Sequence, residues 1–412
     1  MSKSIQLYLH VHQPWRIREY SAFDTGSNHN YWLSSPHSGA NNASIIRKIA
    51  KKSYLPTNAV LKNLLDRYPD FKISLSITGT FIEQCEQFAP EVLDSFKDLI
   101  KTGKVEVVGE TYYHSLAFFY NLAEFDRQVA MHAKKIQELF GVTPTAFRNT
   151  ELAYNNDLGK WADIHGYKTI LAEGWEKVLD WRSPNYVYSP SNATKTRLLL
   201  KNYKLSDDIA FRFSDRSWSE YPLTIDKYIK WLDSEDAPLV NLFIDYETFG
   251  EHQWSDTGIF DFLKALPKAW LDLPDHKFMT VTEAASVNEP VGVLDVPYTT
   301  TWADAERDLS AWLGNRMQQE AAHHVYSLAP AIMATGDINL IGDWRRLTTS
   351  DHIYYMSTKY WSDGDVHAYF SPYTSPYDAF LYYMNALRDI RYRLIEHQDR
   401  LGLNSKTNRI HR

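Results

Sequence analysis

The amino-acid sequence predicts an α/β fold in which strands alternate with helices over the first two thirds of the chain, before a mainly helical C-terminal region. Short apolar runs such as 105–108 and 240–244 are nearly continuous, which is typical of strands buried on both faces of a parallel sheet. Longer segments between them, such as 58–67, carry an apolar stripe at helical spacing. Alternating units of this kind predict a parallel sheet or a barrel.

The expected elements follow this alternation along the chain. Strands are expected at 5–9, 72–77, 105–109, 145–147, 169–172, 209–213, 239–244 and 278–281, with helices at 58–67, 90–102 and 124–140. The polar, Ser/Asn-rich segment 19–56 is too long for a tight connection, and we expect a loop or lid there.

The C-terminal region has a different pattern. Acids open the segment 304–328 and an acid opens 376–397, and the second segment becomes basic toward its end. This distribution favours two long helices, because acids stabilise helix starts and bases stabilise helix ends. We therefore expect a catalytic α/β region over 1–290, with the loop or lid insertion near 19–56, and a helical domain over 291–412.

Composition narrows the function. The net charge of −7 excludes nucleic acid and anionic membrane surfaces as expected partners, because both require a clustered basic face. Cys85 is the single cysteine, so the chain forms no internal disulfide. We see neither a signal peptide nor a stretch of ~20 apolar residues, and we expect a cytoplasmic protein. Aromatic residues make up 14% of the chain, and such rings stack well on sugars.

Four polar clusters directly follow predicted strands. They are 10–15, 109–114, 148–151 and 245–252. Because the carboxyl ends of parallel strands share one edge of the fold, we expect the clusters to converge on one site. Their content is carboxylates, histidines and aromatics, and glycoside hydrolysis requires two carboxylates that flank the bond. Glu247 follows Asp245 by two residues, so its charge could hold Asp245 protonated.

In this order the clusters resemble the conserved regions of glycoside hydrolase family 57, α-amylase type. The regions concerned are 12–14, the Glu110 and His114 pair, the Glu151 segment, 245–254 and 302–315. The resemblance implies an incomplete TIM-like (β/α)7 barrel with a helical domain that completes the cleft. It also implies retaining cleavage of α-1,4 bonds in an α-glucan or maltooligosaccharide without a cofactor or metal. One departure concerns subgroup: members often carry Trp shortly before the nucleophile, whereas 147–150 reads Phe-Arg-Asn-Thr.

The resemblance also assigns roles to individual residues. The nucleophile falls on Glu151 and the general acid/base on Asp245. The expected substrate-binding residues are His10, His12, Gln13, Trp15, Glu110, His114, Glu247, His252, Trp254, Trp302, Asp304 and Trp312.

Other interpretations of these residues stay open. Glu151 is alternatively a structural partner of Arg148, and Asp245 alternatively caps the next helix. His10 and His12 resemble a zinc motif of related barrels, but Pro14 stands where that motif has a ligating Asp.

Three alternative functions accompany these readings. A 4-α-glucanotransferase or branching activity would use the same carboxylate pair. A non-catalytic glucan-binding protein, and more remotely a metal-dependent deacetylase, belong to other classes.

Overall fold

The computed structural model describes residues 2–35, 37–359 and 369–400. Contacts between Cα atoms divide the chain into two compact units. The first comprises 1–13, 46–111 and 129–303, and the second comprises 14–45, 112–128 and 304–412. The expected division into a catalytic region over 1–290 and a helical domain over 291–412 stays a prediction.

The first unit is an incomplete TIM-like barrel. Its parallel strands are β1 (Lys3–Val11), β2 (Ile73–Ile77), β3 (Val105–Val107), β4 (Ala146–Arg148), β5 (Thr169–Glu173), β7 (Arg197–Lys201) and β8 (Leu239–Asp245). They form two sheets, with strand orders β3-β2-β1-β8 and β4-β5-β7. The predicted fold class is confirmed.

Backbone hydrogen bonds join the two sheets into a ring. Gly109, just after β3, donates to the carbonyl of Ala146 at 2.8 Å, and Arg148 donates to the carbonyl of Gly109 at 2.9 Å. On the other side, Asn202 after β7 donates to the carbonyl of Asn241 in β8 at 2.9 Å. The strand order around the described barrel is therefore β1-β2-β3-β4-β5-β7-β8.

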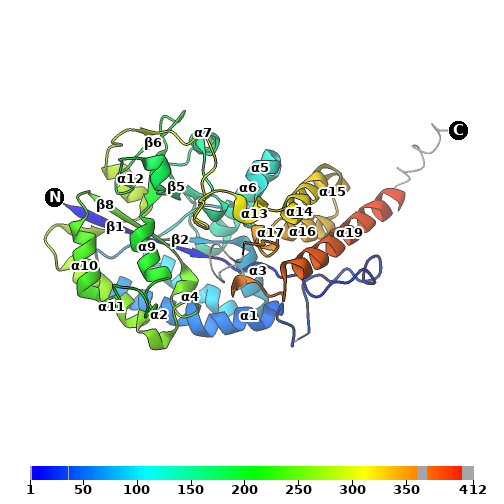
Figure 1. Cartoon of the computed structure of the whole chain (residues 1–412), viewed down its shortest axis with the longest axis horizontal. Coiled ribbons are helices and arrows are strands. Elements are labelled where there is room, and N and C mark those ends of the chain that lie inside the picture. Colours follow the sequence, from blue (N-terminus) through cyan, green and yellow to red (C-terminus); the bar gives the residue numbers. More distant parts are fainter. Residues whose placement is uncertain (1, 36, 360–368, 401–412) are drawn as a thin grey trace. The chain divides into compact units, whose positions relative to one another are not determined.

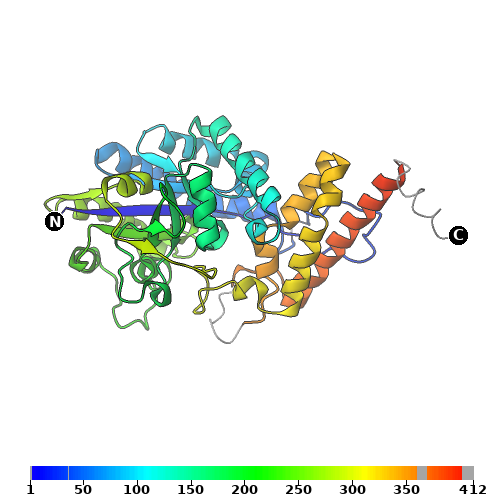
Figure 2. The same ribbon diagram turned by 90° about the horizontal axis from the view of Figure 1, so that it is seen from above.

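Helices cover the outside of this ring, which explains the apolar strands. Residues 4–11 of β1 and 239–244 of β8 are buried. The surrounding helices include α2 (Leu55–Arg67), α4 (Pro90–Ile100) and α11 (Ile259–Leu271), and Figures 1 and 2 show helices on both sides of β1. Strands covered in this way have no solvated face, so they lose the alternation of polar and apolar residues.

Two of the expected strands are wrong. The segment 209–213 is not a strand, because helix α9 (Tyr203–Ala210) includes its first two residues. The barrel strand in this part of the chain is β7, which precedes α9. Asn202 starts that helix by accepting a hydrogen bond from the backbone N–H of Leu205. The strand expected at 278–281 instead lies at β9 (His276–Phe278). It ends at Phe278 because Thr280 and Glu283 form a capping box that starts α12 (Val281–Val287).

The expected loop over 19–56 is shorter than predicted. Helix α1 (Asn42–Ile49) and a π-helical turn, η1 (Ala50–Tyr54), occupy its last part. The Asn41 side chain accepts from the backbone N–H of Ser44 at 2.7 Å and so caps this helix.

The second unit is mainly helical. Its helices include α5 (Ala117–Tyr120), α13 (Ser310–Leu313), α14 (Arg316–Ser327), α15 (Ala329–Thr335), α16 (Ile338–Leu347), α17 (Ser350–Tyr354) and α19 (Pro376–Arg400). Figure 1 shows α14, α16 and α19 side by side, and contacts link α19 to both of the others. The helix α6 (Leu122–Phe140) spans the boundary of the contact-defined units at residue 128.

The single helix expected over 304–328 is broken. Asp304 and Arg307 have left-handed backbone angles, with φ of 55° and 52°. A new helix then starts at Arg316, because Asn315 and Gln318 form a capping box. The second expected helix is confirmed as α19, which continues three residues beyond His397.

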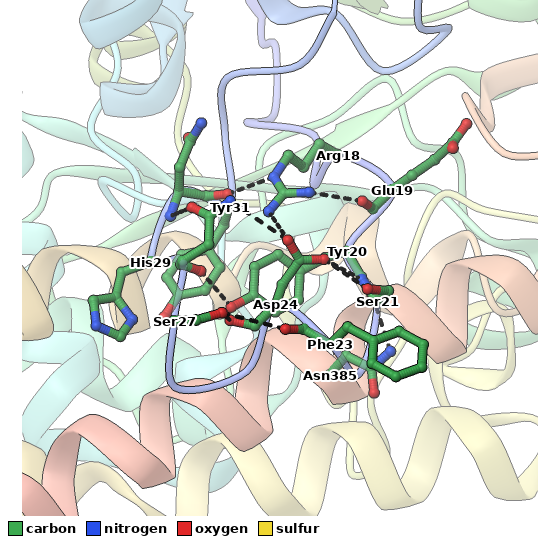
Figure 3. Close-up of polar contacts among 12 residues, drawn as sticks. Arg18, Glu19, Tyr20, Ser21, Phe23, Asp24, Ser27, His29, Tyr31 and Asn385 are labelled. Carbon is green, nitrogen blue, oxygen red and sulfur yellow. Dashed lines mark hydrogen bonds and ion pairs between the residues drawn. The ribbon is translucent and has the colours of Figure 1, made fainter.

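Within this unit, a buried carboxylate on α19 binds the segment 18–31, and Figure 3 shows the polar contacts that this segment makes within itself, such as that of Arg18 with Asp24. Asp389 on α19 is fully buried. It accepts hydrogen bonds from the Gly26 N–H at 2.6 Å, from His29 Nδ1 at 2.8 Å and from the Tyr31 hydroxyl. The segment also holds itself through the Arg18–Asp24 ion pair at 2.7 Å.

We predict that Asp389→Ala destabilises the protein by roughly 2–4 kcal/mol, because three buried or half-buried donors lose their acceptor. Asp399→Ala on the exposed side of the same helix is the matched control and should stay within about 0.5 kcal/mol. Urea unfolding of the full chain measures both changes. Equal effects of the two substitutions would contradict the role assigned to Asp389.

In the ranges that the structure describes, no helix combines the length and apolar character needed to cross a membrane.

Candidate active site

Glu151 lies directly after β4, in the short 3-10 turn η2 (Thr150–Leu152). Glu151 and Leu152 both have left-handed backbone angles, with φ of 59° and 51°. A non-glycine residue in this region costs on the order of 1–3 kcal/mol, and such residues concentrate at functional sites. The requirements of folding do not explain two left-handed residues in succession. The backbone geometry therefore marks this turn as a candidate functional site.

Trp302 donates two hydrogen bonds to Glu151. The Trp302 backbone N–H donates to the Glu151 carbonyl at 3.2 Å, and its indole Nε1 donates to Glu151 Oε2 at 2.9 Å. The indole also has two cations near it: the Arg148 guanidinium is 4.9 Å and Lys201 Nζ is 5.4 Å from the ring centroid. Cations at these distances are attracted to the ring, so the indole that orients the Glu151 carboxylate is itself held.

A row of polar side chains runs across the neighbouring strands. His10 of β1 meets Ser76 Oγ of β2 at 2.8 Å through Nδ1, and this nitrogen lies 3.7 Å from Glu110 Oε1. The other Glu110 oxygen lies 3.7 Å from Arg148 Nη1 on β4. Glu110 and Arg148 are both fully buried. The His10 ring also meets the Trp302 ring edge-to-face at 6.1 Å, so the row returns to the residue that holds Glu151.

Asp245 is the last residue of β8 and is the register neighbour of His10 on β1. Glu247 follows in the 3-10 turn η3 (Tyr246–Thr248), where its Oε1 accepts from the Tyr54 hydroxyl at 2.5 Å and the His12 N–H at 3.4 Å. Burial, and then the negative charge of Asp245, raise the pKa of Glu247 to about 8.

This pKa bears on the predicted effect of Glu247 on Asp245. We expected Glu247 to act on Asp245 as a like charge that keeps Asp245 protonated. In the structure the negative charge of Asp245 contributes to the raised pKa of Glu247, and the protonation of Asp245 itself stays a prediction.

The pH dependence of stability follows from this shift. The pKa of Glu247 is higher in the folded than in the unfolded chain, so the stabilisation from its proton is complete below pH ~4.5 and is lost as the pH rises toward about 8. We predict that Glu247→Gln, which cannot ionise, flattens this decline by up to about 1.4 kcal/mol per pH unit. Urea unfolding from pH 5 to 9 measures the difference, with Glu289→Gln as the exposed control. Parallel stability curves for wild type and Glu247→Gln would rule the shift out.

The turn after β8 depends on one glycine. Gly250 has φ of 105°, and a Cβ there would lie 2.0 Å from the Lys52 carbonyl oxygen of η1. Since only glycine tolerates both conditions, Gly250 allows η1 to pack against this turn. That packing brings Tyr54 to Glu247.

The barrel topology places Glu151 and Asp245 on opposite walls. Between β4 and β8 lie two strands in one direction around the ring and three in the other. Both residues are at carboxyl ends, so they face the same opening.

Substrate binding by the remaining predicted residues of the first unit stays a prediction. The Gln13 carbonyl accepts from Gln84 Nε2 at 2.9 Å. Burial lowers the pKa of His252 to about 4, so its ring is neutral at neutral pH. Trp254 is 57% exposed and carries Lys52 Nζ 4.7 Å from its ring centroid.

Two predicted tryptophans belong to the second unit and are buried there. Trp15 has the Arg346 guanidinium 5.3 Å from its ring centroid. Trp312 packs against Tyr354, with ring centroids 5.8 Å apart. Their predicted contacts with substrate stay predictions.

His114 and Asp304 also belong to the second unit, and both have left-handed backbone angles. The His114 carbonyl accepts from the Ser350 N–H at 2.9 Å. The Asp304 carboxylate lies 3.4 Å from Lys359 Nζ. Substrate binding by these two residues likewise stays a prediction.

Sequence reasoning missed four residues of the first unit. Ser76 and Thr78 hold the rings of His10 and His12, and their position at the end of the predicted second strand was a usable signal. Lys201 ends a strand that was not predicted. Tyr54 lies in a segment that we interpreted as a loop.

Comparison with known proteins decides the family. The sequence model described as glycosyl hydrolase family 57 matches residues 6–297. The chain belongs to glycosyl hydrolase family 57. It is therefore a family 57 enzyme that acts on glycosidic bonds, which confirms the family and the enzyme class that we predicted.

Relatives in this family agree over most of the chain. A putative alpha-amylase of Methanocaldococcus jannaschii is 44% identical over 400 residues, which cover 94% of this chain and 84% of that protein. The barrel and helical unit resemble two solved family structures in fold. A branching enzyme from Thermococcus kodakaraensis has a TM-score of 0.65 at 12% identity, with 86% of each chain covered. A 4-alpha-glucanotransferase from Thermococcus litoralis has a TM-score of 0.64 at 16% identity, and the match covers 96% of this chain and 60% of that chain.

Proposed function

We propose that this family 57 enzyme hydrolyses α-1,4-glucosidic bonds of α-glucans such as starch, glycogen and maltooligosaccharides, with retention of anomeric configuration. Glu151 is the nucleophile and Asp245 the general acid/base. The observation that carries the proposal is the placement of these carboxylates at the carboxyl ends of β4 and β8, on opposite walls of one barrel opening. The names of the relatives support an α-glucan as substrate.

The proposed reaction has two displacements. A Glu151 oxygen attacks the anomeric carbon while Asp245 gives its proton to the glycosidic oxygen, so the C–O bond breaks and a glycosyl ester forms on Glu151. Asp245 then takes a proton from water, whose oxygen attacks the same carbon and releases Glu151. Two inversions at one carbon restore the original configuration.

Trp302 and Glu247 support this pair without forming bonds to the sugar. The indole N–H of Trp302 fixes Glu151 Oε2, so the carboxylate reaches the anomeric carbon in one orientation. Below pH ~8, Glu247 keeps a proton beside Asp245 and limits the negative charge at that wall. His10, His12 and Glu110 are polar groups at the same end of the barrel that suit sugar hydroxyls.

Transfer to another sugar is the second candidate, because a branching enzyme and a glucanotransferase share the fold. We predict that maltoheptaose gives products shorter than the substrate, each released first as the α-anomer. NMR of the reducing ends, together with chromatography, measures both properties. Products longer than maltoheptaose would establish transfer, and an initial β-anomer would contradict double displacement.

Metal-dependent deacetylation is the remaining alternative. His10 and Glu110 are residue types that also ligate metals, so chelation is a direct test. Hydrolysis that continues in excess EDTA supports the carboxylate mechanism, and activity that is lost and then restored by a divalent cation contradicts it.

A further inference from the structure

A cavity with a mainly apolar lining lies in the first unit. Its volume is about 590 Å³, and it lies among residues 174–184, helix α9, residues 218–220 and the end of α10 (Ile225–Ser234). This size is typical of small-molecule sites. None of the residues proposed above for catalysis lines it.

Aromatic rings form one side of the cavity. Trp218 and Trp231 both line it, with ring centroids 6.0 Å apart and planes at 71°. Two nearly perpendicular rings make a corner, in which a sugar ring can stack on one indole and touch the edge of the other. Tyr203 adds a third aromatic ring to the lining.

The two tryptophans are held in place. Trp231 is on helix α10. Trp218 belongs to a turn in which its backbone N–H donates a hydrogen bond to the Asp215 carbonyl at 3.2 Å. The Arg212 guanidinium lies 5.6 Å from the Trp218 ring centroid, and Lys227 Nζ lies 5.9 Å from that of Trp231. Rings ordered before binding lose little conformational entropy when a ligand arrives.

The carboxylates that line the cavity have partners. Two of its carboxylates pair with cations that do not line it: Asp208 with Arg212 at 2.7 Å and Glu220 with Lys227 at 3.3 Å.

The other two lining acids are also satisfied. Glu176 pairs with Lys204 at 2.7 Å, and Glu235 accepts from the Asn185 amide at 2.5 Å. Three of the four lining carboxylates therefore have a cationic partner, and the fourth has an amide partner. Carboxylates that are compensated in this way favour a neutral ligand with many hydroxyls over an anion or a cation, because they keep hydrogen-bonding capacity.

We propose that this cavity is a non-catalytic binding site for a stretch of α-glucan. The choice of α-glucan over other neutral oligosaccharides rests on the proposed function. The cavity is connected to the proposed catalytic region through two consecutive residues. Asn202 lines the cavity, and Lys201, which precedes it, lies over the ring of Trp302. A polymer bound here stays close to the barrel opening, so the site raises its effective concentration for cleavage.

The test measures binding without turnover, in full-length Glu151→Gln protein run through gels that contain soluble starch. We expect Trp218→Ala and Trp231→Ala to weaken starch binding roughly five- to tenfold. Trp181→Ala is the matched control, because Trp181 is 83% exposed and does not line the cavity. Ser234→Trp is an independent variant at an exposed position of the lining, and its added bulk should likewise weaken starch binding.

Kinetics on the otherwise wild-type chain gives the second readout. In the cavity variants the KM for starch should rise by a similar factor, while kcat on maltotriose stays unchanged. Starch binding that is equal in all the variants and in the Trp181→Ala control overturns the proposal. Activity that survives Glu151→Gln removes only the catalytic assignment, because retardation in the gel is read separately.

Discussion

Glu151→Gln is expected to lower kcat on maltoheptaose by roughly 10⁴- to 10⁶-fold, the largest effect of any single substitution. The amide keeps the size of the side chain and can still accept the Trp302 hydrogen bond, but it cannot form the glycosyl ester. The fold should therefore persist, and KM should change little. Single-turnover kinetics with circular dichroism on the same sample measures both properties.

Two further variants test whether this result is specific to the carboxylate of Glu151. Glu289→Gln changes the same chemical group at an exposed position and should leave kcat unaltered. In Glu151→Ala, the space left by the side chain should admit azide, and a β-glycosyl azide should accumulate. Full activity in Glu151→Gln would remove this residue from the mechanism and return it to the structural role beside Arg148.

Asp245→Asn is expected to lower kcat by roughly 10²- to 10⁴-fold, the range for loss of a general acid/base. The loss should depend on the leaving group, because a fluoride needs less protonation than a sugar alcohol. Activity on α-maltosyl fluoride should thus fall less than activity on maltoheptaose. The alkaline limb of the pH–rate profile should also disappear in the variant.

An equal loss on both substrates would show that Asp245 is not the acid. Asp261→Asn is the matched control, because this aspartate lies exposed on α11 and should tolerate the change.

The barrel was predictable where strands are buried on both faces. Strands β1 and β8 have long apolar runs, and both were found. Strand β7 was missed because its three leucines lie between Arg197 and Lys201, which interrupt the pattern. The segment 209–213 has the composition of a strand, but the cap at Asn202 commits the preceding residues to a helix. Local capping therefore outweighed β propensity at this point.

The site was predictable to the extent that it follows strand ends. Glu151 comes three residues after β4 and Asp245 is the last residue of β8, so parallel topology brings them to one edge. Tyr54 contacts Glu247 across 193 positions of sequence, and a π-helical turn places it there. Such long-range contacts leave no local pattern. The two hydrogen bonds that Trp302 donates to Glu151 also leave no local sequence pattern, since they depend on the left-handed turn at Glu151.

The most direct test of the central claim is the position of the covalent intermediate. A 5-fluoro-α-maltosyl fluoride should form a slowly hydrolysed ester with the wild-type enzyme, and peptic digestion with mass spectrometry should locate the sugar. We predict one labelled peptide, with the added mass on Glu151, and no label in Glu151→Gln. A label on Glu247, Glu110 or Asp245, or inactivation without any covalent label, would contradict it.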